Sequence, residues 1–576
     1  MEVDIGAAIV SCSRSLRRAV LASLAFAAVS GGITVARQAG ADSAQANSAA
    51  ARLSNTAAPV QTTAAPVQTT AAPVQTTNIP TPAPPTRLVH RYLSTRISPD
   101  GTWVAAVEGD APPGGAHPPL RALVLHPLHG KALLDVPLAC GKQRECWPGS
   151  PTWSADSRHV YFTLRTPGQH SYSIYSAATD GGEPLKVLDF DGTIVDLRMM
   201  PDGRLAMLAT PAARKESGAT EAAAPLAGDL DETPPVQRLA VLDHGSLQWL
   251  SPPELYVYEY DWLPGGRIFV GTAASGDGDA NWWLARLYQF VGEAQPPRAI
   301  YTPTDIHQQL AHPRVSPDGR TVAFIAGIMS DFGLTGGDVY TLPIAGGSAT
   351  NLTPGMLASA TSLSWGCSGH LLVAFLAGDS TQLTDLGLPG APQSRVLWSA
   401  AETLAGDEAL LSTACKPGLT ATVHESFTQP PEIAVGPIGR WHDITAANSG
   451  LSSHAQVRSL QWVSDRFNVQ GWLLLPENVR GKLPLVTLVH GGPASAAQPY
   501  FSGPGLAESL LERGYALLRP NPRGSYGQGE RFTLANYRDF GHGDMGTSSL
   551  ASMRRKRQRR STMHDLASPA AATAAS

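Results

Sequence analysis

The stretch Thr95-Arg96-Ile97-Ser98-Pro99-Asp100-Gly101-Thr102-Trp103-Val104-Ala105 decides the fold, because the chain repeats it. A close copy is Arg314-Val315-Ser316-Pro317-Asp318-Gly319-Arg320-Thr321-Val322-Ala323. Each copy reads as strand, tight turn, strand, since proline presets φ for the turn and Asp-Gly supplies a corner with positive φ. Weaker copies lie at residues 153–162, 200–205, 262–270, 365–373 and 414–419.

The spacing of these copies predicts the architecture. A four-stranded propeller blade needs roughly 40–50 residues plus loops. The intervals between equivalent positions are 56, 46, 63, 53, 50 and 49 residues, counted from Pro99, Ala155, Pro201, Pro264, Pro317, Cys367 and Lys416. We therefore predict an all-β seven-bladed propeller over residues 88–440. The propeller alone indicates no function, because this fold serves enzymes and binding proteins alike.

The region before the propeller predicts export. Three arginines precede an Ala-, Leu- and Val-rich run at residues 19–36, and small-residue cleavage sites follow it, which is the pattern of a signal peptide over residues 1–46. We expect a periplasmic or secreted protein; an uncleaved membrane anchor is the alternative. The apolar run is short for a stable span. Residues 47–87 repeat Ala-Pro-Val-Gln-Thr-Thr three times and predict a disordered Pro/Thr-rich linker.

Composition narrows the classes of partner. The chain has 576 residues, too many for one core, and a formal net charge of −4, which gives no indication of nucleic-acid binding. No cysteine or histidine group has metal-ligand spacing, so we predict neither a metal nor a cofactor. Cys140 and Cys146 flank a five-residue loop and form a disulfide in one interpretation; two reduced thiols are the alternative. Oligomeric state is not indicated.

A second pattern predicts the incomplete N-terminal part of an α/β-hydrolase domain over residues 455–546. The apolar run Leu485–Val489 ends in His490-Gly491-Gly492-Pro493, residues 506–513 have a helical period, and residues 516–520 form another apolar run. Strands that alternate with a helical segment predict a parallel α/β sheet. A buried strand that opens into a glycine turn is how an α/β-hydrolase builds half of its oxyanion hole.

Together these motifs resemble the prolyl oligopeptidase family of serine peptidases, in its dipeptidyl aminopeptidase and acylaminoacyl peptidase branch. The resemblance implies peptide substrates, a propeller that restricts access to the cleft, and no cofactor. It is carried by the Ser-Pro-Asp-Gly repeat, Trp472-Leu473-Leu474-Leu475-Pro476, His490-Gly491-Gly492-Pro493 and Arg523-Gly524-Ser525-Tyr526-Gly527. It also implies that His490, Gly491, Gly492 and Pro493 form a turn beside the oxyanion, with a purely structural turn as the alternative. We interpret the loop from Arg523 to Gly527 as structural.

The catalytic residues of that family are missing. The nucleophile should lie on a Gly-x-Ser-x-Gly elbow between a strand and a helix, which the sequence does not contain. Ser525 lies on a loop instead. The triad histidine should follow the nucleophile, so we interpret His490 as structural. We predict no catalytic residue and a serine-type peptidase that is inactive as written; the alternative is an exported, non-catalytic propeller that binds peptides or a partner.

Residues 547–576 depart from the family pattern. They contain the basic run Arg554-Arg555-Lys556-Arg557-Gln558-Arg559-Arg560 and end in an Ala-rich stretch. We interpret them as the aberrant tail of a truncated or frameshifted chain, with a solvated tail as one alternative. A basic patch for nucleic acid or membrane is the other alternative.

Overall fold

The computed structural model describes residues 88–548 except 112–120, 131, 139–145, 167–170, 213–234, 277, 391–392, 407, 454, 478, 480 and 504. Every described residue belongs to one compact unit. The predicted signal peptide, the linker, Cys140 and nearly all of the predicted tail lie outside the described residues, so these predictions stay predictions.

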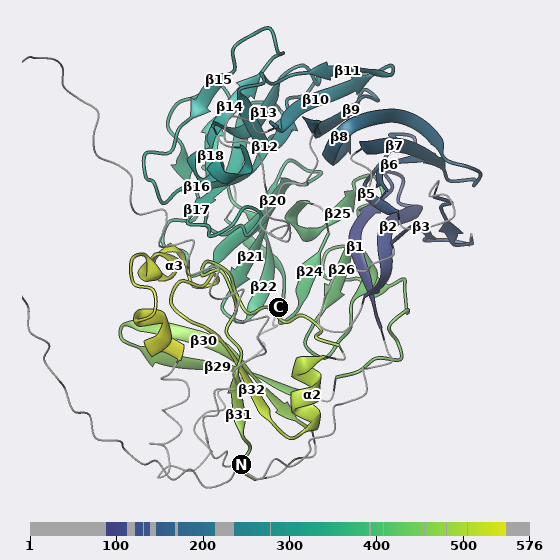
Figure 1. Cartoon of the computed structure of the whole chain (residues 1–576). Helices are drawn as coiled ribbons and strands as arrows, with labels where there is room; N and C mark the ends of the chain where they lie inside the picture. Colours follow the sequence, from purple (N-terminus) through teal and green to yellow (C-terminus); the bar gives the residue numbers. More distant parts are fainter. Residues whose placement is uncertain are drawn as a thin grey trace, which may run out of the picture. The chain divides into compact units, whose positions relative to one another are not determined.

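Antiparallel strands over residues 89–443 form seven successive blades (Figure 1). Blades 1, 4, 5 and 6 are separate four-stranded sheets, blades 2 and 3 share β8, and in blade 7 both β24 and β25 pair with β26. The first three blades contain β1 (Val89–Ile97), β2 (Trp103–Ala111), β3 (Ala122–Pro127), β4 (Leu134–Asp135), β5 (Trp147–Trp153), β6 (His159–Arg165), β7 (Ser171–Ala178), β8 (Leu185–Met199), β9 (Leu205–Pro211), β10 (Arg238–Asp243) and β11 (Ser246–Trp249).

The remaining blades follow the same order. They contain β12 (Leu255–Trp262), β13 (Phe269–Ser275), η3 (Gly278–Leu284), β14 (Arg286–Phe290), β15 (Arg298–Tyr301), β16 (Gln309–Val315), β17 (Thr321–Gly327), β18 (Asp338–Pro343), β19 (Thr350–Asn351), β20 (Ser359–Trp365), β21 (Leu371–Ala377), β22 (Ser380–Leu386), β23 (Arg395–Ala400), β24 (Thr403–Ala405), η4 (Glu408–Leu410), β25 (Ser412–Ala414), β26 (Leu419–Glu425), β27 (Glu432–Gly436) and β28 (His442–Asp443).

The repeated motif closes the inner hairpin of each blade. In blade 1 the Ser98 hydroxyl donates to the Asp100 carboxylate over 2.6 Å, and Gly101 has a φ of 71°. Ser316 and Asp318 repeat the contact in blade 5. A side-chain hydrogen bond of this kind fixes the turn through residues that are close in the sequence, so the turn can be recognised from the sequence alone. Six of the predicted turns join the first two strands of a blade, and the seventh joins β25 to β26 in blade 7, so the predicted propeller is confirmed.

Side-chain packing closes the ring. Within the described residues, seven buried clusters each join two neighbouring blades. The last cluster packs Val104 and Ala106 of blade 1 against Val423 and Ile433 of blade 7. No strand is shared between those two blades in the described sheets, so side-chain contacts hold this junction: buried apolar surface and polar contacts such as that of Arg91 with Glu425.

After the propeller, the chain forms a second, mixed sheet with the order β29-β30-β32-β31. Its elements are β29 (Ala455–Ser464), β30 (Phe467–Pro476), β31 (Leu485–Thr487), α2 (Leu506–Glu512), β32 (Ala516–Asn521), α3 (Glu530–Thr533) and η5 (Leu534–Asn536). Only β31 and β32 are parallel, because a hairpin joins β29 to β30 and β30 pairs antiparallel with β32. We call residues 455–548 the hydrolase segment.

The first residue of the predicted tail is part of the packed structure. Thr547 is fully buried, and its carbonyl accepts a hydrogen bond of 3.1 Å from the Trp462 indole. Order therefore extends at least through this residue. Among the described residues, no helix is long and apolar enough to cross a membrane.

Candidate functional site

Two motifs that are distant in the sequence meet at one edge of the hydrolase sheet. β31 and β32 are parallel neighbours, so the residues that follow them emerge at the same edge. His490 follows β31 and Ser525 follows β32, and the His490 Nε2 lies 2.9 Å from the Ser525 Oγ. The Ser495 carbonyl also accepts a hydrogen bond of 2.8 Å from the Tyr526 N–H, which ties the two turns together.

The protonation of His490 limits what this pair can do. Burial lowers the pKa of His490, so the imidazole is neutral near pH 7 and carries one N–H. Its Nδ1 lies 2.7 Å from the Gly491 carbonyl, which can only accept a hydrogen bond. If Nδ1 donates to that carbonyl, Nε2 becomes an acceptor for the Ser525 hydroxyl. A catalytic triad instead places a carboxylate on Nδ1.

Ser525 is held inside its loop. Its side chain is fully buried, and its Oγ lies 2.7 Å from the Pro522 carbonyl, a second acceptor for the single hydroxyl proton. The Thr533 hydroxyl donates to the Ser525 carbonyl over 3.1 Å. A nucleophile must reach its substrate, so a buried serine with two internal acceptors is arranged for structure rather than attack.

The glycine turn has the backbone that its sequence requires. Gly492 has a φ of 129°, which L side chains rarely adopt, and a Cβ there would lie 2.9 Å from the Ala494 nitrogen. At Gly491 no atom lies within 4 Å of a Cβ position, so space is open beside this residue. The oxyanion-side role of His490, Gly491, Gly492 and Pro493 stays a prediction.

The loop at Arg523–Gly527 contacts the propeller, which the sequence reasoning missed. The Tyr526 hydroxyl donates to the Leu334 carbonyl over 2.8 Å, between β17 and β18 of blade 5. The Gly527 N–H donates to the Ser359 hydroxyl over 3.0 Å. The Gly527 carbonyl accepts a 2.7 Å bond from the Gly378 N–H of blade 6. The loop therefore links the propeller to the hydrolase segment, while its interpretation as purely structural stays a prediction.

A second contact joins the halves at blades 1 and 7. The Arg91 guanidinium lies 2.9 Å from the Glu425 carboxylate and also donates to the Phe501 carbonyl over 2.8 Å. The Phe501 N–H donates to the same carboxylate over 2.8 Å. Both charged side chains are mostly buried, so each depends on the other for compensation of its charge.

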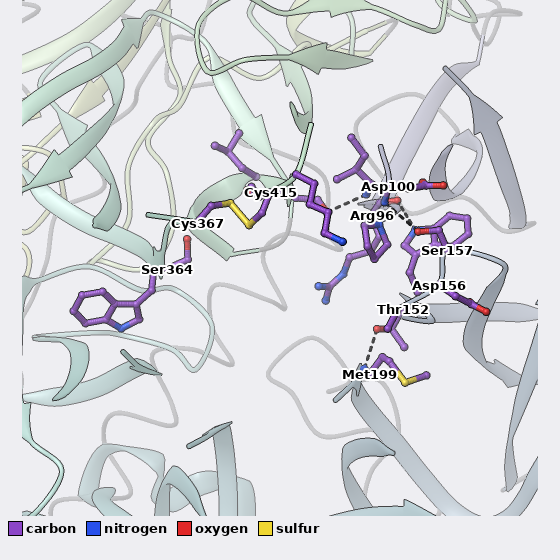
Figure 2. A pocket seen from close by; sticks show the side chains of 18 residues that line it. Arg96, Asp100, Thr152, Asp156, Ser157, Met199, Ser364, Cys367 and Cys415 are labelled. Carbon is purple, nitrogen blue, oxygen red and sulfur yellow. Dashed lines mark hydrogen bonds between the residues drawn. A yellow bond between two sulfur atoms is a disulfide. The ribbon is translucent and has the colours of Figure 1, made fainter. Parts of the chain in front are cut away.

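A polar cavity of about 620 Å³ lies among the inner hairpin turns of blades 1, 2, 6 and 7 (Figure 2). Figure 2 shows the disulfide between Cys367 and Cys415 on one side and Arg96, Asp100 and Ser157 on another. The cavity presents two cations, two carboxylates and five hydroxyls: Arg96, Lys416, Asp100, Asp156, Thr152, Ser157, Ser364, Ser412 and Thr413. Such a lining suits a polar ligand such as a peptide backbone rather than an apolar one.

The inner strands of blades 3 and 4 also carry charges. Arg198 and Asp261 hold the position two residues before the turn, as do Arg96 and Thr152 in blades 1 and 2. The Arg198 guanidinium lies 3.3 Å from the Asp196 carboxylate and 3.9 Å from the Tyr260 ring centre. Burial raises the pKa of the neighbouring Glu259 to about 7. This row of polar side chains can be found in the sequence, because the residue two positions before each of the seven turns is polar.

Cysteine pairing departs from the sequence reasoning. Cys367 and Cys415, for which no pairing was predicted, form a disulfide between the turns of blades 6 and 7. Cys146 is buried and disulfide-bonded, while Cys140 lies outside the described residues, so the pairing of these two stays a prediction. No group of three or more His, Cys, Asp or Glu side chains in the described residues could hold a metal ion.

Comparisons with known proteins agree with this architecture. A probable dipeptidyl-peptidase 5 of Aspergillus niger is 25% identical over 247 residues, 42% of this chain and 34% of that protein. An acylaminoacyl peptidase in complex with Z-Gly-Gly-Phe-chloromethyl ketone has a TM-score of 0.60 at 16% identity, with 82% of this chain and 72% of that chain covered. One prolyl endopeptidase structure has a TM-score of 0.57 at 14% identity, covering 81% and 67%. No family model matches the chain.

The chain shares with these solved structures a β-propeller followed by a small mixed sheet. It is related to the peptidases of the prolyl oligopeptidase family. Its match spans about a third of the length of the Aspergillus relative.

Proposed function

We propose that this chain provides the substrate-access propeller and the oxyanion-side turn of a serine-type peptidase, but does not itself cleave peptides. The Ser525–His490 pair carries this proposal. Its hydroxyl is buried against a backbone carbonyl, and the imidazole Nδ1 faces another carbonyl instead of a carboxylate. Losing the members of a triad typically removes on the order of 10⁶ in kcat, which leaves only binding and oxyanion effects.

An active-site-directed fluorophosphonate tests the proposal. The purified full chain is incubated with the probe beside an active peptidase of the family as a positive control, and labelled peptides are mapped by mass spectrometry. We expect no labelled serine in this chain. Labelling at Ser525 that is abolished in Ser525→Ala and retained in Ser368→Ala would overturn the proposal, because it would show an accessible, activated nucleophile at the pair.

A non-catalytic binding propeller is the second candidate, and the polar cavity favours it. A cavity of about 620 Å³ with hydroxyls and both signs of charge matches the groups of a peptide. A mixed library of unlabelled peptides can be passed over immobilised chain and the retained fraction sequenced. Retention that Lys416→Gln and Thr413→Val reduce would support binding at this cavity; retention that both variants leave unchanged would remove the support.

We further propose an exported location. The predicted leader is one support, and the disulfide of Cys367 and Cys415 is the other, because structural disulfides persist mainly in oxidising compartments. Fractionation of cells that produce the full chain, followed by immunoblotting, tests this. Recovery of the chain only in the cytoplasm with an unprocessed leader would contradict it.

A further inference from the structure

The contact between the hydrolase segment and blades 5 and 6 contains a carboxyl group without a counter-charge. We call residues 524–530 the latch loop. Glu530 ends this loop and begins α3. Its Oε1 is buried without a hydrogen-bond partner and lies so close to blade 5 that a Cβ at Gly327 would come within 2.9 Å of it. A buried, unpartnered carboxylate oxygen is costly when it is charged.

In the described part of the chain, no cationic side chain compensates a charge on Glu530, and one backbone N–H does so only in part. Asp338 of β18 repels a charge on Glu530, while the Ile328 N–H favours one. Burial raises the pKa of Tyr340 of β18 and of Tyr526 of the latch loop, and a charge on Glu530 raises both further. Asp331, between β17 and β18, also raises the pKa of Tyr526. Within the described residues, no Lys, Arg or His forms an ion pair with Glu530 or Asp338.

The latch loop is otherwise closely fitted to the propeller. The Tyr526 ring fills the space beside Gly336, where a Cβ would lie 2.3 Å from the ring. Gly529 approaches the Met356 carbonyl so closely that a Cβ would lie 2.3 Å from it. The Gly527 backbone also forms hydrogen bonds with Gly378 and Ser359 of blade 6. Close backbone packing of this kind tolerates a neutral carboxyl but not the water shell that a charged carboxylate requires.

We propose that Glu530 is a proton-sensitive latch. The latch loop stays seated on blades 5 and 6 while the Glu530 carboxyl carries a proton, and it releases when that proton passes to solvent. Arg91 and Glu425 hold the other side of the same interface by hydrogen bonds with the Phe501 backbone, so release at Glu530 would free one side alone. The proposal does not depend on peptidase activity.

The direction and size of the pH effect follow from linkage. Burial and the Asp338 charge raise the pKa of Glu530 from 4.5 to about 8 in the seated loop. At any pH between about 4.5 and about 8, the seating of the latch loop is therefore accompanied by the uptake of a proton at Glu530. The equilibrium constant for seating should fall by up to about tenfold per pH unit from about 4.5 to about 8, and level off above.

Hydrogen–deuterium exchange of the full chain tests the latch. The protection of amides in residues 524–530 is measured from pH 5 to 9 and corrected for intrinsic exchange rates, with β20 as the internal reference. We expect wild-type protection of the loop to fall with pH while β20 stays constant. Glu530→Gln removes the ionisation without changing the shape, so its loop should stay protected at every pH. Glu512→Gln, at an exposed site on α2, should behave as wild type.

Two results would overturn the proposal. One is an unchanged pH dependence in Glu530→Gln, which would assign the effect to another group. The other is a wild-type loop whose corrected protection does not vary with pH, or varies only together with β20. Asp338→Asn provides a second variant: removal of the repelling charge should weaken the pH dependence, and a fall as steep as that of wild type would also count against the latch.

Discussion

The disulfide between Cys367 and Cys415 gives a prediction whose size can be worked from the structure. Replacement of both cysteines by serine removes a cross-link between residues 48 positions apart. Both side chains are exposed, so the substitution loses little buried surface. Chain entropy in the unfolded state should therefore dominate the effect. For a closed loop of this length the entropic model gives a loss of about 4 kcal/mol in the free energy of unfolding.

The assay is urea unfolding of the full chain, followed by tryptophan fluorescence with and without a dithiol reductant. Without reductant, the Cys367→Ser/Cys415→Ser variant should unfold at a lower urea concentration than wild type. In reductant, wild type should lose its advantage and the two midpoints should coincide. Ser368→Ala, in the same exposed turn, should match wild type in both conditions. Peptide mapping of unreduced protein verifies the pairing.

Equal midpoints without reductant would refute the reasoning, since the cross-link would then contribute nothing that the surrounding blades do not already supply. A difference that persists at full size in reductant would refute it in another way. The effect would then come from the side chains in the turn and not from the covalent bond.

Three further predictions concern the interface and the turns. Glu425→Gln leaves the mostly buried Arg91 without its carboxylate and should lower the free energy of unfolding by about 3–5 kcal/mol, part of which Arg91→Met should restore in the double variant, as measured by urea unfolding. Gly336→Ala places a methyl group where the Tyr526 ring lies and should abolish the protection of the latch loop in hydrogen exchange, whereas Leu334→Ala, which shortens an exposed side chain in the same connection, should leave it intact. The Ser316 hydroxyl lowers the pKa of Asp318 below 3.8. The stability that this turn contributes is therefore present above pH 3.8 and is lost as the pH falls below that value. Between about pH 5 and about pH 2.5, the urea midpoint of Asp318→Asn should fall less than that of wild type.

The propeller was predictable because its information is local. Ser98, Asp100 and Gly101 bond and bend within one turn, and the same local chemistry recurs in blade after blade. A repeat that encodes a turn also fixes the strands on both sides of it. The number of blades then follows from counting the turns.

The disulfide was predictable in principle but was missed. Cys367 and Cys415 fall at nearly the same place in the motifs of two consecutive blades. Equivalent turns of neighbouring blades lie side by side, so two cysteines there are close even though 48 positions separate them. The pair becomes apparent only when each cysteine is placed at its position in the repeat.

Contacts between the two halves were beyond sequence reasoning. The proximity of His490 to Ser525 depends on the order β30-β32-β31, which hydrophobic periodicity does not encode. The bond from Tyr526 to Leu334 joins residues 192 positions apart and depends on how a loop fits between blades. Such contacts come from the shapes of folded surfaces, and the motif that contains Tyr526 gives no sign of its partner.

The shared strand β8 has a consequence for how the chain acquires its structure. Residues 185–191 pair with β7 of blade 2, and residues 192–199 pair with β9 of blade 3, without a connecting loop. The outer edge of blade 2 therefore continues directly into the inner strand of blade 3. These two blades should open during thermal fluctuations as one cooperative unit about twice the size of the others.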